Sequence, residues 1–67
     1  MKVEINKQEI SVPEGITTLE ELLKAENLAG AGTAVAIGGN VVRRAYWCTY
    51  SLHDGLRITV ISAVCGG

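Results

Sequence analysis

The chain is expected to fold into an α+β structure in which one main helix packs on one face of a mixed sheet. Polar and apolar residues alternate near both ends of the chain, at residues 2–6 and 56–64, as they do in half-buried strands. One helical pattern follows Pro13. A helix and a sheet must bury their apolar sides against each other. The hairpin and the later strands are therefore expected to form one sheet, with the helix as a second layer on it.

The N-terminal alternation predicts a β-hairpin. Residues 2–6 form its first strand, residues 6–9 a tight turn and residues 9–12 its second strand. Pro13 ends the second strand because proline has no amide hydrogen to donate to a sheet.

The helix is expected to begin at a threonine. Thr17 with Glu20, or Thr18 with Glu21, has the spacing of a capping box, in which a hydroxyl and a carboxylate bind the free amides of the helix start. Its apolar face consists of leucines at helical spacing, namely Leu19, Leu22 and Leu23. The helix is expected to end near Asn27 or before Gly30, and residues 29–32 are expected to form a small flexible connection.

The middle of the chain predicts a second hairpin. The apolar run at residues 34–37 favours a short strand that is buried on both faces. The Gly-Gly-Asn sequence at residues 38–40 supplies the positive φ angles of a tight turn, and residues 41–42 pair back.

The last strand is expected to lie in the centre of the sheet. Residues 43–50 lack a clear period and are interpreted as an irregular or 3₁₀ crossing segment, which the turn at residues 54–55 follows. Residues 56–64 are the longest and most β-branched stretch, with Leu56, Ile58 and Val60 on one side. Since crossovers are right-handed, this strand should run parallel to the first one. The arrangement is the β-grasp, or ubiquitin-like, roll.

The composition restricts the function. The chain has 67 residues, 48% of them hydrophobic, and its six basic and seven acidic side chains give a net charge of −1. We therefore expect one domain, residues 1–67, without the basic face that nucleic acid requires. The apolar runs fall short of the roughly 20 residues that cross a bilayer, and no signal segment is visible. A cytoplasmic location without a membrane partner is expected.

No set of catalytic residues is apparent. His53 is the only histidine, so there is no two-histidine metal site and no relay, and His53 beside Asp54 is expected to face water. Cys48 sits among aromatic residues and is expected to be packed, and Cys65 has no base nearby in sequence. We predict no catalytic residue, no metal site and no cofactor bound by the chain itself.

The C-terminal residues carry the one feature that suggests chemistry. Val64 and Cys65 lead into Gly66 and Gly67, and residues 64–67 are expected to form a flexible tail. Glycines have no Cβ, so such a tail can enter a narrow channel and approach a partner's backbone closely. The reactive group is then the α-carboxylate of Gly67, which is a poor electrophile until an enzyme couples it to a phosphate leaving group.

Several segments together match a known pattern: residues 15–23 and 34–37, Val42, Arg44, Trp47, Asp54-Gly55 and the terminal Gly66-Gly67. On these residues the chain resembles the ThiS family, the sulfur-carrier proteins of thiamine biosynthesis, over nearly its whole length. The departures from the family pattern are Arg43 for a proline, Gly38 for an asparagine, Leu56 for an acidic residue and Cys65 for a small residue. Leu56 is therefore expected to leave an exposed apolar spot.

The resemblance implies a carrier that acts as a co-substrate of partner enzymes. It implies that a ThiF-like activating enzyme, which would hold ATP and Mg²⁺, adenylates Gly67. Sulfur from a donor such as a cysteine desulfurase would then give a thiocarboxylate, from which a ThiG-like thiazole synthase takes the sulfur. Val64, Cys65 and Gly66 would thread the partner's active site.

Other interpretations remain open at this point. A carrier resembling the small subunit of molybdopterin synthase also ends in Gly-Gly and becomes a thiocarboxylate, although that family tends to be longer. A protein-conjugating modifier would join Gly67 to lysine side chains. A plain β-grasp binding module would instead use the sheet face around Leu56 and Ile58.

Overall fold

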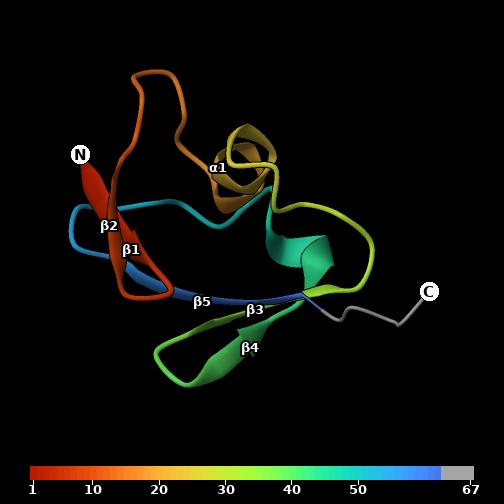
Figure 1. Cartoon of the computed structure of the whole chain (residues 1–67). Helices are drawn as coiled ribbons and strands as arrows, with labels where there is room; N and C mark the ends of the chain where they lie inside the picture. Colours follow the sequence, from red (N-terminus) through yellow and green to blue (C-terminus); the bar gives the residue numbers. More distant parts are fainter. Residues whose placement is uncertain (63–67) are drawn as a thin grey trace.

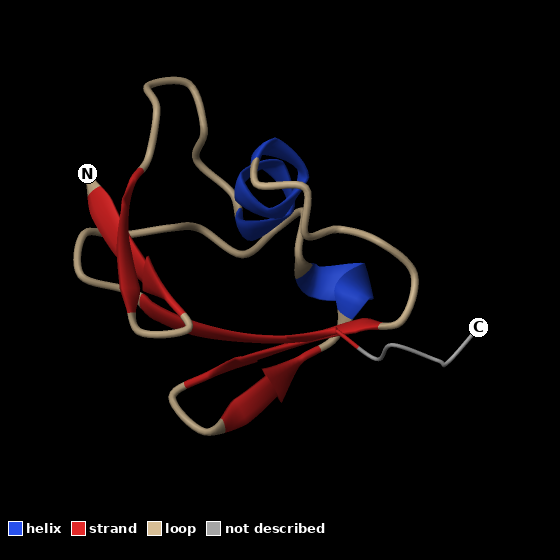
Figure 2. Ribbon diagram, viewed as in Figure 1, coloured by secondary structure: helices blue, strands red, loops and turns tan. Residues whose placement is uncertain are grey.

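The chain forms one five-stranded mixed sheet with a helix on one face, as the computed structural model of residues 1–62 describes it (Figures 1 and 2). In chain order the elements are β1 (Lys2–Ile5), β2 (Gln8–Ser11), α1 (Leu19–Ala25), β3 (Thr33–Ile37), β4 (Asn40–Val42), the 3₁₀ helix η1 (Arg44–Tyr46) and β5 (Arg57–Ser62). The tail predicted for residues 64–67 lies outside the described residues.

The strand order is β2-β1-β5-β3-β4, which puts the last strand in the centre. β5 runs parallel to β1 and antiparallel to β3, while β2 and β4 are the outer partners of two antiparallel hairpins. This is the β-grasp arrangement, so the predicted fold class is confirmed.

A two-residue turn joins β1 to β2. Asn6 and Lys7 both have positive φ angles, 51° and 69°, as the tight turns that match the twist of a hairpin require. The second strand therefore begins at Gln8, one residue earlier than the sequence predicts.

The capping box at the start of α1 is confirmed for one of the two predicted pairs. The Thr18 hydroxyl accepts a hydrogen bond from the Glu21 amide at 3.3 Å, and the Glu21 carboxylate accepts one from the Thr18 amide at 3.1 Å. The helix has 7 residues, too few for stability in isolation. Its leucines (Leu19, Leu22 and Leu23) are fully buried, and each contributes about 1.5–3 kcal/mol by leaving water.

The crossing segment packs against the start of α1. The amides of Leu19 and Glu20 donate to the carbonyls of Tyr50 and Trp47 at 2.9 and 3.1 Å. Two of the amides that a helix start leaves without an internal partner are thereby satisfied. The indole of Trp47 is 1% exposed and is the largest of the fully buried side chains.

The core lies between α1 and one face of the sheet. Its buried members are Val3, Ile5, Val12, Leu19, Leu22, Leu23, Val35, Trp47, Leu56, Ile58 and Val60. The prediction that β3 is buried on both faces is wrong, since Val35 is buried but Ala34 is exposed. Small alanine side chains occupy the uncovered face, so the apolar run needs no second layer above it. Among residues 1–62 no helix is long and apolar enough to cross a membrane.

Candidate functional site

The central strand β5 leads into the predicted tail. Its last residue, Ser62, pairs with Thr33, the first residue of β3, and Figure 1 shows β5 beside β3 in the sheet. The predicted site residues Val64, Cys65, Gly66 and Gly67 lie outside the described residues. Their roles therefore stay predictions. The strand that precedes them pairs with β1 only near its start, at Arg57 and Ile58, and with β3 from Ile58 to Ser62.

The face of the sheet that α1 does not cover has an apolar half near this point. Register places Ile61 opposite Ala34 and Ala36 opposite Val41. Val41 is 74% and Ile61 58% exposed, unusually high values for aliphatic residues within a sheet. We call these four residues, Ala34, Ala36, Val41 and Ile61, the open-face patch.

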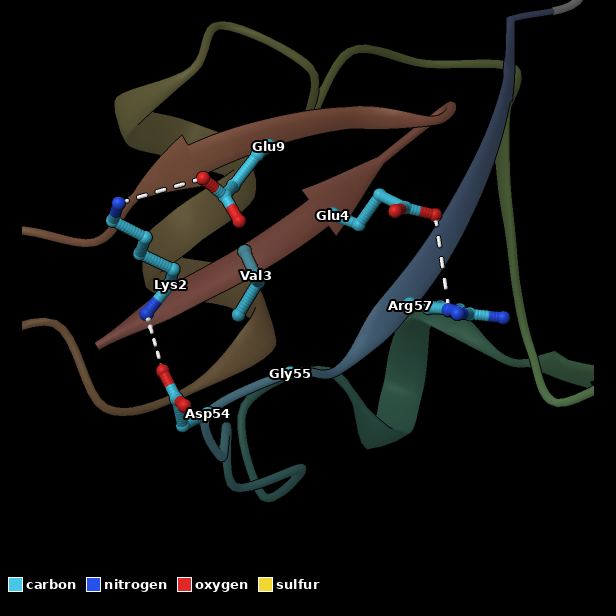
Figure 3. Close-up of a pocket in the computed structure, with 7 residues that line it drawn as sticks. All are labelled: Lys2, Val3, Glu4, Glu9, Asp54, Gly55 and Arg57. Carbon is cyan, nitrogen blue, oxygen red and sulfur yellow. Dashed lines mark hydrogen bonds and ion pairs between the residues drawn. The ribbon is translucent and has the colours of Figure 1, made fainter.

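The other half of the open face is charged and hollowed (Figure 3). Register aligns Glu9, Glu4 and Arg57 across three neighbouring strands. Lys2 Nζ lies 3.4 Å from Glu9 Oε1, and Arg57 Nε lies 3.9 Å from Glu4 Oε2. These groups line a cavity of about 270 Å³ together with Val3, Asp54 and Gly55. Because the ion pairs are largely in water, they add little to stability.

The interpretation of Leu56 and Ile58 as an exposed binding face is wrong. Leu56 is 4% and Ile58 2% exposed, and both belong to the core. The residues of β5 that alternate with them, Arg57, Thr59 and Ile61, are the exposed ones. Side chains along a strand point alternately to its two faces. This alternation alone could have identified Arg57, Thr59 and Ile61 as the residues on the face away from the helix.

The prediction that Cys48 is packed among aromatic residues is also wrong. Trp47 enters the core, whereas Cys48, in the turn that follows η1, is exposed. His53 is exposed, as predicted, and its Nδ1 lies 3.1 Å from the Asp54 carbonyl oxygen. Within residues 1–62 no group of three or more His, Cys, Asp or Glu side chains is arranged to hold a metal ion.

Two residues of the family pattern are in direct contact. The guanidinium carbon of Arg44 lies 4.4 Å from the centre of the Trp47 ring, within the range of a cation–π interaction. The indole Nε1 of Trp47 donates to the carbonyl of Val42 at 2.9 Å. Arg44, Trp47 and Val42 therefore form one packed unit that ties η1 to the end of β4.

Comparisons with known proteins agree with this structure. The model of the ThiS family matches residues 2–67. The sulfur carrier protein ThiS of Escherichia coli (strain K12) is 31% identical over 67 residues, which cover 100% of both chains.

Two solved structures of a thiamine biosynthesis protein from Geobacter metallireducens are similar over the whole of this chain. The crystal structure, described as ThiS, has a TM-score of 0.80 at 26% identity and is covered to 100%. The solution structure has a TM-score of 0.77 at 25% identity and is covered to 88%. With a family model that spans nearly every residue and a relative of equal length above 30% identity, this chain belongs to the ThiS family.

Proposed function

We propose that this chain is a sulfur carrier of thiamine biosynthesis and that it carries sulfur on the α-carboxyl group of Gly67. The observation that carries the proposal is the match, end to end, with a relative named as a sulfur carrier. The β-grasp fold that this chain shares with the solved ThiS structure supports it, and a carrier whose reacting group is on Gly67 would need no catalytic site of its own.

The proposed chemistry has three steps. The Gly67 carboxylate attacks the α-phosphorus of ATP, which forms an acyl-adenylate and releases pyrophosphate. A persulfide sulfur on a donor protein then attacks the acyl carbon, and AMP leaves with the bonding electron pair. A second thiol reduces the resulting acyl disulfide, becomes oxidised to a disulfide, and leaves a thiocarboxylate on Gly67.

The partners would supply what the carrier lacks. We assign ATP and Mg²⁺ to a ThiF-like activating enzyme, the persulfide to a donor such as a cysteine desulfurase, and consumption of the thiocarboxylate to a ThiG-like thiazole synthase. Val64, Cys65 and Gly66 would lie in the channel of the partner, and a bulky side chain at Gly66 or Gly67 would obstruct it. The whole sequence would act as one cytoplasmic domain.

The open-face patch is the proposed contact surface for the activating enzyme. One of its four residues, Ile61, lies on β5 next to the last residue of that strand, so a partner that receives the tail would come close to it. Val41 and Ile61 present exposed apolar area of the kind that protein partners cover. The charged half, with paired cations and anions, suits a polar rim.

An intact-mass measurement tests the function directly. The protein is incubated with ATP, a thiamine-pathway activating enzyme, a sulfur donor and a thiol reductant. We expect a mass gain that corresponds to one oxygen exchanged for one sulfur, and fragmentation should place it on Gly67. If no gain occurs while the same enzymes modify a known carrier, the proposal is wrong.

A further inference from the structure

The side chain of Arg44 joins the segment of η1 and Trp47 to the connection between α1 and β3. Its guanidinium stacks on Trp47 at 4.4 Å. Its Nη1 donates to the carbonyl oxygen of Ala29 at 3.0 Å, and its Nη2 donates to that of Gly30 at 2.6 Å. Hydrogen bonds from a charged donor are stronger than those between neutral groups. The planar guanidinium can make all three contacts at once, which a lysine ammonium cannot.

These contacts fix the second half of the connection between α1 and β3, residues 26–32. Its first half is held by Leu28, which packs against the core and whose amide donates to the Leu23 carbonyl at 2.7 Å. Residues 30–32 are Gly-Ala-Gly and have no large side chain to bury. The sequence predicts a flexible connection at residues 29–32. The structure instead anchors it through Arg44, which lies 14 positions from Gly30 along the chain.

The anchored segment leads by short steps to the end of β5. The carbonyl of Gly30, which accepts from Arg44, also accepts a hydrogen bond from the Thr33 amide at 3.3 Å. Thr33 begins β3 and is the register partner of Ser62. Residues 63–67 follow Ser62 directly in the sequence. One guanidinium is therefore linked through one carbonyl to the strand pair from which the chain end departs.

We propose that Arg44 is a positioning residue that fixes the base of the C-terminal tail for the activating enzyme. The proposal rests on the carrier function proposed above. When the clip formed by Arg44, Gly30 and Thr33 is intact, the end of β5 is ordered before the partner binds. A carrier without it must order this end during docking, and that entropic cost weakens binding.

The kinetic consequence is specific. Once the carrier is bound, the partner itself holds the tail, so the chemical step should be little affected. We expect Arg44→Ala to raise the KM for the carrier in ATP–pyrophosphate exchange by about tenfold, with kcat changed by less than about twofold. Arg44→Lys, which can donate to one carbonyl but cannot stack in the same way, should give an intermediate KM.

Arg43→Ala is the matched control. Arg43 is the adjacent residue, carries the same charge and is exposed, and it caps η1 without a side-chain hydrogen bond. Its removal should leave the KM near the wild-type value. If Arg43→Ala raises the KM as much as Arg44→Ala does, the basic charge steers the partner and the clip has no positioning role.

Amide hydrogen exchange separates positioning from general loss of structure and needs no enzyme. In Arg44→Ala, exchange should accelerate by about tenfold in residues 30–34 and 58–62, and stay unchanged in β1 and β2. Uniform acceleration over the sheet, or no local acceleration, overturns the proposal. If the wild-type chain is never adenylated, the carrier function fails, while the exchange result still decides whether Arg44 orders the end of β5.

Discussion

The side-chain amide of Asn6 makes two hydrogen bonds with the backbone of Val60. Asn6 Nδ2 donates to the Val60 carbonyl at 3.1 Å, and the Val60 amide donates to Asn6 Oδ1 at 2.8 Å. Backbone pairing of β1 with β5 stops because the chain turns away at Asn6, whose φ is 51°. The side chain thus continues the parallel ladder after the backbone has left it. Asparagine suits both tasks, since it tolerates a left-handed φ and carries a donor and an acceptor.

Replacing Asn6 by glycine should therefore destabilise the protein although glycine fits the turn. Asn6→Gly keeps the positive φ and loses both hydrogen bonds, so we expect the free energy of unfolding in urea to fall by about 1–2 kcal/mol. Lys7→Gly is the control, because Lys7 also has a positive φ of 69° and sits in the same turn. It should leave stability unchanged or raise it. Equal stability of Asn6→Gly and the wild type would contradict this account.

Stability should fall in acid partly through one carboxylate. Hydrogen bonds from the backbone amides of Thr17 and Thr18, and from the Thr18 hydroxyl, lower the pKa of Glu21 below its ordinary value. A folded-state pKa below the unfolded one means that the stabilisation is present above the unfolded pKa and is lost as the pH falls through the folded value.

Glu21→Gln removes this titration while keeping an oxygen that can accept the same amides. We expect urea unfolding of Glu21→Gln to show a shallower loss of stability than the wild type as the pH is lowered below the ordinary glutamate range. At neutral pH the variant should be the less stable of the two, because a charged acceptor binds amides more strongly. Parallel pH curves for the two proteins would show that Glu21 contributes nothing.

A proline should be accepted at position 43, where the family pattern has one. Arg43 has φ −64° and ψ 145°, values that proline adopts without strain. Val42 before it is in a strand, as residues before proline prefer. We expect Arg43→Pro to raise the free energy of unfolding by about 0.4–1 kcal/mol by restricting the unfolded chain. The melting temperature checks this, and a decrease would indicate that the Arg43 amide or side chain is needed.

Most of the fold follows from local patterns in the sequence. Each of these patterns predicts one element by itself. Alternating residues predict the strands β1 and β5, the spacing of the leucines predicts α1, and the glycines after β3 predict the turn of the second hairpin. The errors concern which face is covered. The run at residues 34–37 is apolar at every position, so the sequence alone does not show that α1 covers one face of the sheet and that Ala34, on the other face, is exposed.

The site was predictable in part, for a related reason. Gly66-Gly67 is readable because it is a local sequence feature, whereas the open-face patch combines Val41 and Ile61 from strands far apart in sequence. Arg44 poses a harder problem. Its hydrogen bonds go to backbone carbonyls, which every residue possesses, so no side-chain pattern in the sequence reveals its partners.

A negative charge in the open-face patch should weaken docking without unfolding the protein. Val41→Asp places a carboxylate at a position that is 74% exposed, so the free energy of unfolding should change by about 1 kcal/mol or less. If a partner covers this position, the charge is desolvated without a counterion, and the KM for the carrier should rise by about tenfold or more.

Ser11→Asp serves as the control for charge on the same face. Ser11 is exposed and lies opposite Lys2 in the charged half of the open face. Its substitution should alter the KM by less than about threefold, since a polar rim contributes little. Equal effects of Val41→Asp and Ser11→Asp would remove the patch from the interface.

Deleting Gly67 should abolish sulfur transfer while leaving stability unchanged. The shortened chain still ends in a glycine carboxylate, that of Gly66, so the chemical group survives and only its reach differs, by about 3.5 Å. Adenylation requires the attacking oxygen to lie within about 3–3.5 Å of phosphorus in the correct orientation, and a displacement of one residue exceeds that tolerance.

Gly67→Ala keeps the reach and adds one methyl group, which should slow the reaction without stopping it. Since the core residues among those that the structure describes precede position 61, we expect the melting temperatures of both variants to equal that of the wild type. Sulfur gain by the shortened chain at the wild-type rate would mean that reach does not limit the reaction, and that the carboxylate of Gly67 is not its site.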